Sequence, residues 1–420
     1  MTKERVMVGV DVGTTKICAL IGEVDQDNRL NIVGVGLAPS QGLRRGMVVN
    51  IDEAAAAIRE ALDKTERISG YKIGTALVGI AGSHITSQNS RGIVAVSPNL
   101  HEITRPDIDR AIDAARAQPL PHNREVLHVI PREYVVDGEA GIHDPLGMSG
   151  NRLEVECHII TGASTSIHNL YKCVEKTGIE ISDIVPEPLA SSEAVLTGAE
   201  RDLGVAMIDI GGGTTDLAIF INGSIWHTGV IGIGGNHLTN DMAVGLRTPF
   251  DVAEELKKKH GSAVAERIDV NEMIKVPTFD NSAGEPVSRR FLCEIIEARV
   301  REMLSLVHEE IRNAGYHGVL PAGVVLTGGS SQLTDIVDLA RDVLAMPARV
   351  GGPAQLTGLV DSINSPAFST SVGLLTWGLK SGDFQTPRGQ VPMLEGGGGP
   401  SWGELFGRFT GWLKHFWASA

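Results

Sequence analysis

Two short segments combine glycine and threonine with an aspartate in a pattern that suits the binding of phosphate groups. The first is DVGTTK, which begins at Asp11, and the second is DIGGGTTD, which begins at Asp209. Each lies between two strand-like runs, so each is expected to be the turn of a β-hairpin. Glycine lets backbone N–H groups approach an anion, and threonine hydroxyls donate further hydrogen bonds. Asp11 and Asp209 end their strands, where a carboxylate can hold a metal ion through water.

The surroundings of the two segments form a weak internal repeat about 200 residues apart, which predicts two related lobes. Two such hairpins that face each other would hold a polyphosphate from both sides, and Lys16 would add positive charge beside the terminal phosphates. The alternative is a pair of ordinary glycine-rich hairpins. Neither segment matches a P-loop or a dinucleotide-binding turn. The candidate phosphate-binding residues are Gly13, Thr14, Thr15, Lys16, Gly211, Gly212, Gly213 and Thr214.

A third glycine segment, GVVLTGGSSQL, begins at Gly323. It predicts a buried strand, a Gly-Gly turn and a helix from about residue 333. A helix N-terminus behind a glycine turn is a good site for a ribose or a phosphate. We therefore expect a nucleoside contact here, with a plain strand-to-helix connection as the alternative. The candidate residues are Gly328, Gly329 and Ser330.

The composition limits the classes of function. A chain of 420 residues is too long for one core and predicts two or more domains. The net charge of −14 offers no basic surface for nucleic acid. The four cysteines are scattered, which argues against a zinc site or a disulfide framework and suits a reducing cytosol. There is no run of eighteen apolar residues, so no membrane-spanning helix is predicted.

The elements that must position these residues follow from periodicity and capping signals. In the first lobe we expect strands at 6–12, 16–24, 30–38 and 72–80, and a helix at 52–69 with Asp52 as its N-cap. Further helices are predicted at 106–117, 251–259 and 288–313. The predicted domains are the first lobe (1–83 and 164–197), an inserted α+β subdomain (84–163), the second lobe (198–363, with a helical subdomain at about 246–314), a return helix (364–380), a flexible linker (381–400) and a tail helix (401–418).

Five motifs in this order resemble those of the actin-like ATPase superfamily. DVGTTK, IDIGGGTTD and VLTGGSS resemble its two phosphate motifs and its adenosine motif. EPLASSEAVL (187–196) and STSVGLLTWG (369–378) resemble its two inter-lobe helices. The resemblance implies a two-lobed α/β fold that binds ATP and Mg²⁺.

Within this superfamily, the segments HVIPREYVVDG, GIHDPLGMSG, VLTGGSSQL and STSVGLL resemble the FtsA family of bacterial division proteins over essentially the whole length. That family ties the ring of the tubulin-like protein FtsZ to the membrane. The resemblance implies filament formation, contacts of the inserted subdomain with neighbouring subunits and division partners, and a place on the cytoplasmic face of the cell membrane at the division site.

The resemblance also implies roles for individual residues. Glu254 and Lys257 match an acid–base pair that contacts ribose and adenine in bacterial actins; an ordinary exposed ion pair is the alternative. Glu187 matches a water-orienting acid, and with Asp209 it forms the candidate catalytic pair. The alternative for Glu187 is an acid in the first helical turn after Pro186, favoured by the helix dipole. At most slow ATPase activity is expected.

The helix at 288–313 is expected to pack one apolar face onto the lobe and to leave four arginines more exposed. In the FtsA family this subdomain docks the C-terminal peptide of FtsZ, which is expected to be acidic, and arginine presents forked donors to carboxylates. A solvated charged face is the alternative. The candidate partner-binding residues are Arg289, Arg290, Arg299 and Arg301.

The end of the sequence predicts a membrane anchor. Six glycines and three prolines between 381 and 400 indicate a flexible linker. In 401–418, large apolar residues recur at steps of one and three, which predicts an amphipathic helix that lies in a membrane interface. Docking of this helix on the protein's own core is the alternative. The predicted membrane face consists of Trp402, Leu405, Phe406, Phe409, Trp412, Leu413, Phe416 and Trp417.

Two other functions share the predicted lobes. A PilM-like pilus protein has the same lobes and insertion but does not need an amphipathic tail on a glycine-rich linker. A small-molecule kinase of the superfamily needs a pocket and a base for a hydroxyl substrate, and no residue in the sequence has that role.

Overall fold

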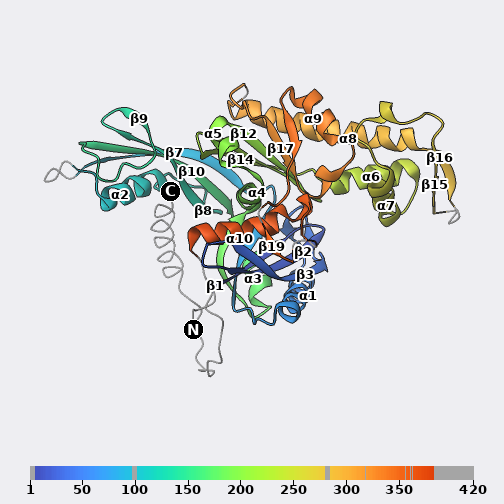
Figure 1. The fold of residues 1–420 in the computed structure, drawn as a ribbon, viewed down its shortest axis with the longest axis horizontal. Helices are drawn as coiled ribbons and strands as arrows, with labels where there is room; N and C mark the ends of the chain where they lie inside the picture. The colour runs from blue at the N-terminus through green and yellow to red at the C-terminus, as the bar shows by residue number, and fades with distance from the viewer. Residues whose placement is uncertain are drawn as a thin grey trace.

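The computed structural model describes residues 5–96, 102–279, 284–316, 318–354, 356–359, 361 and 363–382. These residues form two lobes, each built on a β-sheet, with an inserted subdomain and a helical subdomain at opposite ends (Figure 1). Within these ranges no helix is both long and apolar enough to cross a membrane. Nearly all of the predicted linker and the whole predicted tail helix lie outside the described residues.

The first lobe is built on a six-stranded sheet in the order β11-β6-β1-β2-β3-β19. β1 and β2 form an antiparallel hairpin, and β6 runs parallel to β1. β1 is buried from Val6 to Val12, as expected for a strand covered on both faces. A separate small hairpin joins β4 (Leu43–Arg44) to β5 (Met47–Val48). The sheet comprises β1 (Arg5–Val12), β2 (Lys16–Val24), β3 (Leu30–Pro39), β6 (Thr75–Ile80), β11 (Glu180–Pro186) and β19 (Thr357–Gly358).

Helices α1 (Ile51–Ser69) and α3 (Ser164–Glu175) cover one face of this sheet, and α10 (Ser369–Ser381) covers the other (Figure 1). The side chain of Asn50 accepts hydrogen bonds from the first turn of α1, so Asn50 is the N-cap. The prediction of Asp52 as the N-cap is therefore wrong. The helix ends at Gly70, whose φ of 74° is left-handed, as predicted.

The inserted subdomain has its own sheet, in the order β7-β10-β8-β9, and its own core. Helix α2 (Arg105–Arg116) packs closely on β7: a Cβ atom built on Gly92 would lie only 1.9 Å from the carbonyl oxygen of Ala111, so the glycine permits this approach. Thr104 and Asp107 cap α2 reciprocally, so the helix begins one residue before the predicted start. The strands are β7 (Thr86–Ala95), β8 (Arg124–Val136), β9 (Glu139–Ile142) and β10 (Arg152–Ala163).

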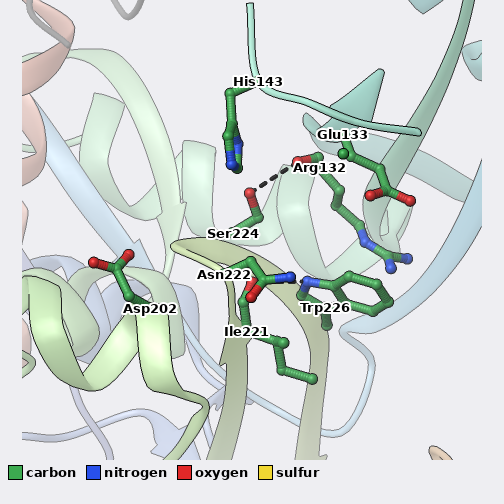
Figure 2. Close-up of a pocket in the computed structure, with 9 residues that line it drawn as sticks. Arg132, Glu133, His143, Asp202, Ile221, Asn222, Ser224 and Trp226 are labelled. Atoms are coloured by element: carbon green, nitrogen blue, oxygen red, sulfur yellow. Dashed lines mark hydrogen bonds between the residues drawn. The ribbon is translucent and has the colours of Figure 1, made fainter. Parts of the chain in front are cut away.

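The inserted subdomain is fastened to β14 (Ser224–Ile231) of the second lobe (Figure 2). The guanidinium carbon of Arg132 lies 3.6 Å from the centre of the Trp226 ring, and Ser224 Oγ donates to the carbonyl of Arg132 at 2.8 Å. Ser87 Oγ donates to the carbonyl of Thr228 at 2.7 Å. A cavity of about 300 Å³ opens beside Arg132 and Trp226. The inserted subdomain lies between β6 and β11 of the first lobe in sequence and contacts β14 of the second lobe in space, so it bridges the two lobes.

The second lobe repeats the plan of the first. Its sheet has the order β14-β13-β12-β17-β18, with β12 and β13 as an antiparallel hairpin and β17 parallel to β12. The lobe also contains α5 (Gly198–Leu203) and α9 (Ile336–Leu344). The predicted pair of related lobes is confirmed. The other strands are β12 (Val205–Ile210), β13 (Thr215–Ile221), β17 (Val324–Thr327) and β18 (Ala348–Val350).

The helical subdomain comprises α6 (Gly235–Leu246), α7 (Phe250–His260), the strands β15 (Met273–Val276) and β16 (Glu285–Ser288), and α8 (Arg289–Asn313). α6 packs on both α7 and α8, so the subdomain begins at α6 rather than at about residue 246.

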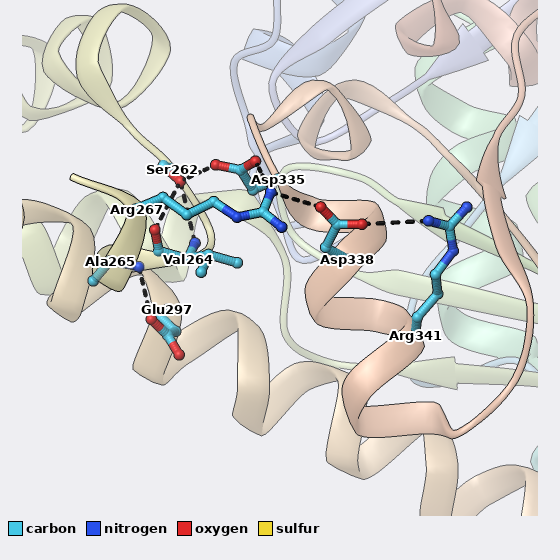
Figure 3. A network of polar contacts seen from close by, with 8 residues as sticks. All are labelled: Ser262, Val264, Ala265, Arg267, Glu297, Asp335, Asp338 and Arg341. Carbon is cyan, nitrogen blue, oxygen red and sulfur yellow. Dashed lines mark hydrogen bonds and ion pairs between the residues drawn. The ribbon is translucent and has the colours of Figure 1, made fainter.

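A polar network fastens the helical subdomain to α9 (Figure 3). Arg267 pairs with Asp335 at 2.5 Å and with Asp338 at 2.6 Å, and Ser262 Oγ donates to Asp335 at 2.7 Å. Asp335 has a left-handed φ of 63° and lies immediately before α9. The helix predicted from about residue 333 therefore begins three residues later, at Ile336.

The chain returns to the first lobe earlier than predicted. Thr357 and Gly358 pair with Asn31 and Ile32 of β3, so the second lobe does not extend to residue 363. The return helix is α10, which a short 3-10 turn at Pro366–Phe368 precedes. It begins five residues after the predicted start at 364.

Helix α10 crosses α4 (Glu187–Val195) between the lobes (Figure 1). A Cβ atom built on Gly373 would lie 1.8 Å from the carbonyl oxygen of Ala190, so the two helix backbones are in direct contact there. Only glycine allows this approach, which brings hydroxyl groups of both helices to the ends of β1 and β12.

Candidate nucleotide-binding site

The two glycine-threonine turns face each other between the lobes. A Cβ atom built on Gly212 would lie 2.0 Å from Thr15 Oγ1, and one built on Gly213 would lie 2.6 Å from Thr14 Oγ1. The structure therefore brings together the two predicted halves of the phosphate site. The missing glycine side chains leave backbone N–H groups accessible at the point of closest approach.

The second turn is held by the start of α6. The N–H of Gly211 donates to the carbonyl of Thr214 at 3.0 Å and closes the turn. The N–H groups of Gly235 and Asn236 donate to the carbonyls of Gly211 and Gly212 at 2.9 and 2.8 Å. These bonds fix the turn against the helix N-terminus, whose dipole favours negative charge nearby.

Buried carboxylates surround the turns. Ser371 Oγ donates to Asp11 at 2.8 Å, and Ser191 and Thr370 donate to Asp209 at 2.5 and 3.2 Å. These hydroxyl groups come from α4 and α10, so the inter-lobe helices orient the two strand-end carboxylates. Both carboxylates were predicted at this place.

The pKa values show the cost of this arrangement. Burial, opposed by Ser191 and reinforced by the charge of Asp11, raises the pKa of Asp209 to about 6. Burial and the charge of Asp209 raise the pKa of Asp216 to about 8. Burial, then the charges of Asp11, Asp216 and Asp209, hold the pKa of Glu187 well above its usual value. With a pKa of about 8, Asp216 is mostly neutral at pH 7, and the protonated form of Glu187 is favoured by the same burial and charges; an added cation would oppose both shifts.

Lys16 brings positive charge to this cluster. Its Nζ donates to the carbonyl of Ala367 at 2.7 Å and lies 3.3 Å from the centre of the Phe368 ring. Burial lowers the pKa of Lys16, while the charge of Asp11 opposes that shift. Lys16 therefore links the first phosphate turn to the 3-10 turn before α10.

The carboxylate cluster fits a bound cation. Glu187 Oε1 and Asp216 Oδ1 are buried without a hydrogen-bond partner, which is costly unless another group reaches them. Among the described residues, no group of three or more histidine, cysteine or acidic side chains is placed to ligate a metal directly. A Mg²⁺ ion that keeps its waters would fit beside such carboxylates. Its binding through Asp11 and Asp209 stays a prediction.

The third glycine turn closes the other end of the site. A Cβ atom built on Gly328 would lie 2.2 Å from Asp209 Oδ1, and one built on Gly235 would lie 2.2 Å from Ser330 Oγ. Gly329 begins a 3-10 turn that ends at Gln332. The turn predicted to contact the nucleoside thus lies against the second phosphate turn and the start of α6.

Glu254 and Lys257 lie beside the same helix start. They pair at 2.7 Å, with their side chains 25% and 12% exposed. Lys257 also donates to the carbonyl of Gly235 at 3.1 Å, and Thr239 donates to Glu254 at 2.5 Å. The pair is thus packed on α6 and is not the ordinary exposed ion pair of the alternative.

Several residues of this site were missed by the sequence analysis. Asp216 follows Thr-Thr in the second turn as Lys16 does in the first, so the internal repeat carried a usable signal. No local signal marked the hydroxyl groups that contact Asp11 and Asp209, because they depend on the crossing of α4 and α10. The missed residues are Ser191, Asp216, Phe368, Thr370 and Ser371.

The four candidate arginines of α8 are more exposed than its buried apolar face, as expected, but each also has an intramolecular partner. Their role in partner binding stays a prediction. Arg289 pairs with Glu272, and Arg290 donates to the carbonyls of Ile268 and Glu266. The other two arginines each contact two acidic side chains: Arg299 contacts Asp241 and Glu302, and Arg301 contacts Asp342 and Glu297. Arg301 is the more exposed of these two, at 46% against 26%.

Comparison with solved structures identifies the class of fold. The chain is similar to a structure of the PilM–PilN type IV pilus biogenesis complex, with a TM-score of 0.64 and 16% identity over 89% of this chain and 98% of that one. It is also similar to MreB5 of Spiroplasma citri, with a TM-score of 0.54 and 16% identity over 89% and 96% of the two chains. The predicted actin-like fold is confirmed.

Comparison of sequences identifies the family. A family described as "Cell division protein FtsA" matches residues 206–373, and one described as "SHS2 domain inserted in FTSA" matches residues 82–161. The chain is 46% identical to cell division protein FtsA of Pseudomonas aeruginosa over 90% of each chain. It is 44% identical to that of Neisseria meningitidis over 98% of this chain and 99% of the relative. The chain belongs to the FtsA family.

Proposed function

We propose that this protein is an ATP-dependent adaptor that assembles into filaments and attaches the FtsZ ring to the cytoplasmic face of the cell membrane at the division site. The observation that carries the proposal is the pair of facing glycine turns around a buried carboxylate cluster and Lys16. Together with membership of the FtsA family, this arrangement supports ATP and Mg²⁺ as the ligands.

In this proposal each part of the site has a separate task. Gly13, Thr14 and Thr15 hold phosphates from the first lobe, and the second turn holds them from the other side. Bound Mg²⁺ supplies positive charge that offsets the phosphates and the acidic cluster. Asp11 and Asp209 would hold that ion through water, and Ser371, Ser191 and Thr370 fix the two carboxylates for that task.

Glu187 is proposed to orient the attacking water. Its Oε1 is buried and unpartnered and its pKa is raised, so the protonated form of the carboxyl group is favoured, and that form cannot accept a proton from the attacking water. A bound cation would lower the pKa and restore the carboxylate. Activity would therefore depend on the bound cation and be slow. In this proposal, slow hydrolysis converts the ATP-bound state of the protein to the ADP-bound state, and the protein acts as a switch and not as an enzyme of rapid turnover.

The nucleotide is proposed to control assembly because it contacts both lobes. Filling the site fixes the lobes relative to each other, and hence the inserted subdomain that bridges them at Arg132 and Trp226. The surfaces of this subdomain are proposed to contact neighbouring subunits and other division proteins. Partners other than nucleic acid are expected, given the net charge of −14.

A groove of about 370 Å³ on the helical subdomain is the proposed site for the acidic C-terminal peptide of FtsZ. Arg290 and Arg301 line it, whereas Arg289 and Arg299 do not. The proposed contact set is therefore narrower than the four arginines of the sequence analysis. The groove also contains Glu266, Glu294 and Glu297, so its acidic side chains outnumber its two arginines, and any attraction for an acidic peptide rests on those two guanidinium groups.

Reversing Arg301 to glutamate is expected to weaken binding of a fluorescent FtsZ C-terminal peptide by about tenfold or more, because a charge-assisted contact is replaced by repulsion. Fluorescence anisotropy at two salt concentrations measures this effect. Arg299→Glu is the matched control and should change the affinity much less. Equal losses in both variants, or none in Arg301→Glu, would place the peptide elsewhere.

Membrane attachment is proposed to reside in the tail at 401–418, which lies outside the described residues. One such helix binds lipid weakly, whereas many tails on a filament bind together by avidity. We expect ATP-bound protein to carry FtsZ to anionic liposomes in co-sedimentation. A chain that ends at Pro400 and the Trp412→Glu variant should leave both proteins in the supernatant.

The control for the tail experiment is Trp412→Phe, which keeps a large apolar ring and should still pellet. The tail is not the anchor if the chain ending at Pro400 pellets as well as the intact protein does. A PilM-like protein or a small-molecule kinase would not bring FtsZ to the vesicles at all. Neither alternative is favoured by any observation beyond the shared fold.

A further inference from the structure

The tip of the β4–β5 hairpin lies against both phosphate turns. The N–H of Gly46 donates to Thr14 Oγ1 at 2.9 Å, so the tip is bonded to the first turn. A Cβ atom built on Gly213 would lie 2.9 Å from the Cα atom of Arg45, so the tip also touches the second turn. Nothing in the phosphate motifs themselves accounts for this third segment.

The tip is also fixed from behind. A Cβ atom built on Gly46 would lie 2.8 Å from the backbone of Ala81 and of Gly82, at the end of β6. The Cα atom of Arg45 is therefore held in one place relative to the two turns. Because its backbone is fixed, the side chain of Arg45 has fewer positions available than an arginine on a flexible surface loop would have.

Arg45 adopts a backbone conformation that does not suit arginine. Arg44 pairs with Met47, so Arg45 and Gly46 form a two-residue turn in which both φ angles are positive, 50° and 74°. Such turns favour asparagine or aspartate at the first position and glycine at the second, because other side chains are strained there. A strained residue beside a candidate site points to a function for its side chain.

The charges around the turns indicate that the side chain of Arg45 binds an anion. Within the part of the chain that the structure describes, no hydrogen bond or ion pair engages the guanidinium of Arg45. Around the turns, the buried acids Asp11 and Asp209 have Lys16 as a cationic neighbour, and Asp216 lies beside Asp209 without such a partner among the groups that shift its pKa. A triphosphate adds several negative charges, and arginine binds phosphate oxygens through paired donors.

We propose that Arg45 binds the terminal phosphates of the nucleotide, as a third contact in addition to the two glycine turns. This inference rests on the proposed ATP binding and assigns to it a residue outside the superfamily motifs. The contact depends on the phosphates that AMP lacks. It follows that Arg45 distinguishes ATP and ADP from AMP and has no part in holding the nucleoside.

The test uses Arg45→Asn in the full-length protein, because asparagine suits the left-handed turn and removes only the guanidinium. Isothermal titration calorimetry with Mg²⁺ should show ATP binding weakened about ten- to a hundredfold, with AMP binding unchanged. The melting temperature without nucleotide should be equal or higher, since strain is relieved. If Arg45 had only a structural role, the variant would instead melt at a lower temperature and would not lose ATP binding selectively over AMP binding.

Arg44→Asn is the matched control, because Arg44 is the exposed neighbour of Arg45 in β4. This variant should bind ATP as the wild type does. If Arg45→Asn and Arg44→Asn both bind ATP like the wild type, the role of Arg45 is wrong while ATP binding stands. If Arg45→Asn weakens AMP as much as ATP, the contact is not to the terminal phosphates. If the wild type itself does not bind ATP, both this inference and the proposed function fail.

Discussion

Replacing Gly373 by alanine is expected to lower the stability of the protein more than other single-methyl additions. The added Cβ would lie 1.8 Å from the carbonyl oxygen of Ala190 and 2.3 Å from its carbonyl carbon. Both atoms belong to the backbone of α4, so neither can rotate away. The helices must move apart, and overpacking of this kind costs about 1–3 kcal/mol or more.

The consequences extend to the candidate site, because α4 carries Ser191 and α10 carries Thr370 and Ser371. Separating the helices lengthens the hydrogen bonds that orient Asp11 and Asp209. We therefore expect Gly373→Ala to lower both the melting temperature, by roughly 1–4 °C, and the stabilisation by Mg–ATP.

Differential scanning fluorimetry with and without Mg–ATP measures both effects. Gly198→Ala is the matched control, since a Cβ atom built on Gly198 meets no atom within 4 Å. It should change the stability by no more than about 0.5 kcal/mol. A Gly373→Ala protein that melts like the control would show that the crossing of α4 and α10 is looser than described.

The sequence predicted the parts of the fold that local pattern determines. The two hairpins of Asp11 and Asp209 were recognised because the strand periodicity and turn glycines of each lie within about twenty residues, and because the same pattern recurs about 200 residues later. Errors arose where two local signals compete. Asn50 and Asp52 are both good capping residues, and the extended backbone at Asn50, with φ of −141°, decides between them.

Other features could not be predicted because they depend on residues distant in the sequence. Asp241 and Asp342 pair with Arg299 and Arg301 of α8, and no helical periodicity of α8 shows this. The hydroxyl groups around Asp209 come from positions on either side of it in the chain. The placement of Arg45 likewise depends on the packing of its hairpin against three other segments.

The raised pKa of Asp216 predicts a pH-dependent stability. Burial and the charge of Asp209 raise this pKa to about 8, above the usual value of 3.8. The folded state therefore binds the proton more tightly than the unfolded state does. Stability from this group is complete below about pH 4 and is lost as the pH rises through about 8, where the buried carboxyl group ionises.

Asp216→Asn should remove this loss, because the amide has the same shape and no charge and can still accept from Thr214 Oγ1, which donates to Asp216 at 2.9 Å. Without nucleotide the variant should be more stable than the wild type at pH 8, by at least about 1 kcal/mol, and the difference should shrink toward pH 5. Thermal melts across this pH range measure the difference. Asp27→Asn, an exposed aspartate in a turn, is the control and should show no such trend.

The same substitution should act in the opposite direction once Mg–ATP is present. A bound cation lowers the pKa of the carboxyl group and turns its charge from a cost into an attraction. The wild type should therefore gain more stability from Mg–ATP at pH 8 than Asp216→Asn does. This reversal distinguishes two cases: an Asp216 whose charge stabilises a bound cation, and an Asp216 whose buried charge only destabilises the fold. Equal gains in the two proteins would show that Asp216 lies outside the field of the bound ion.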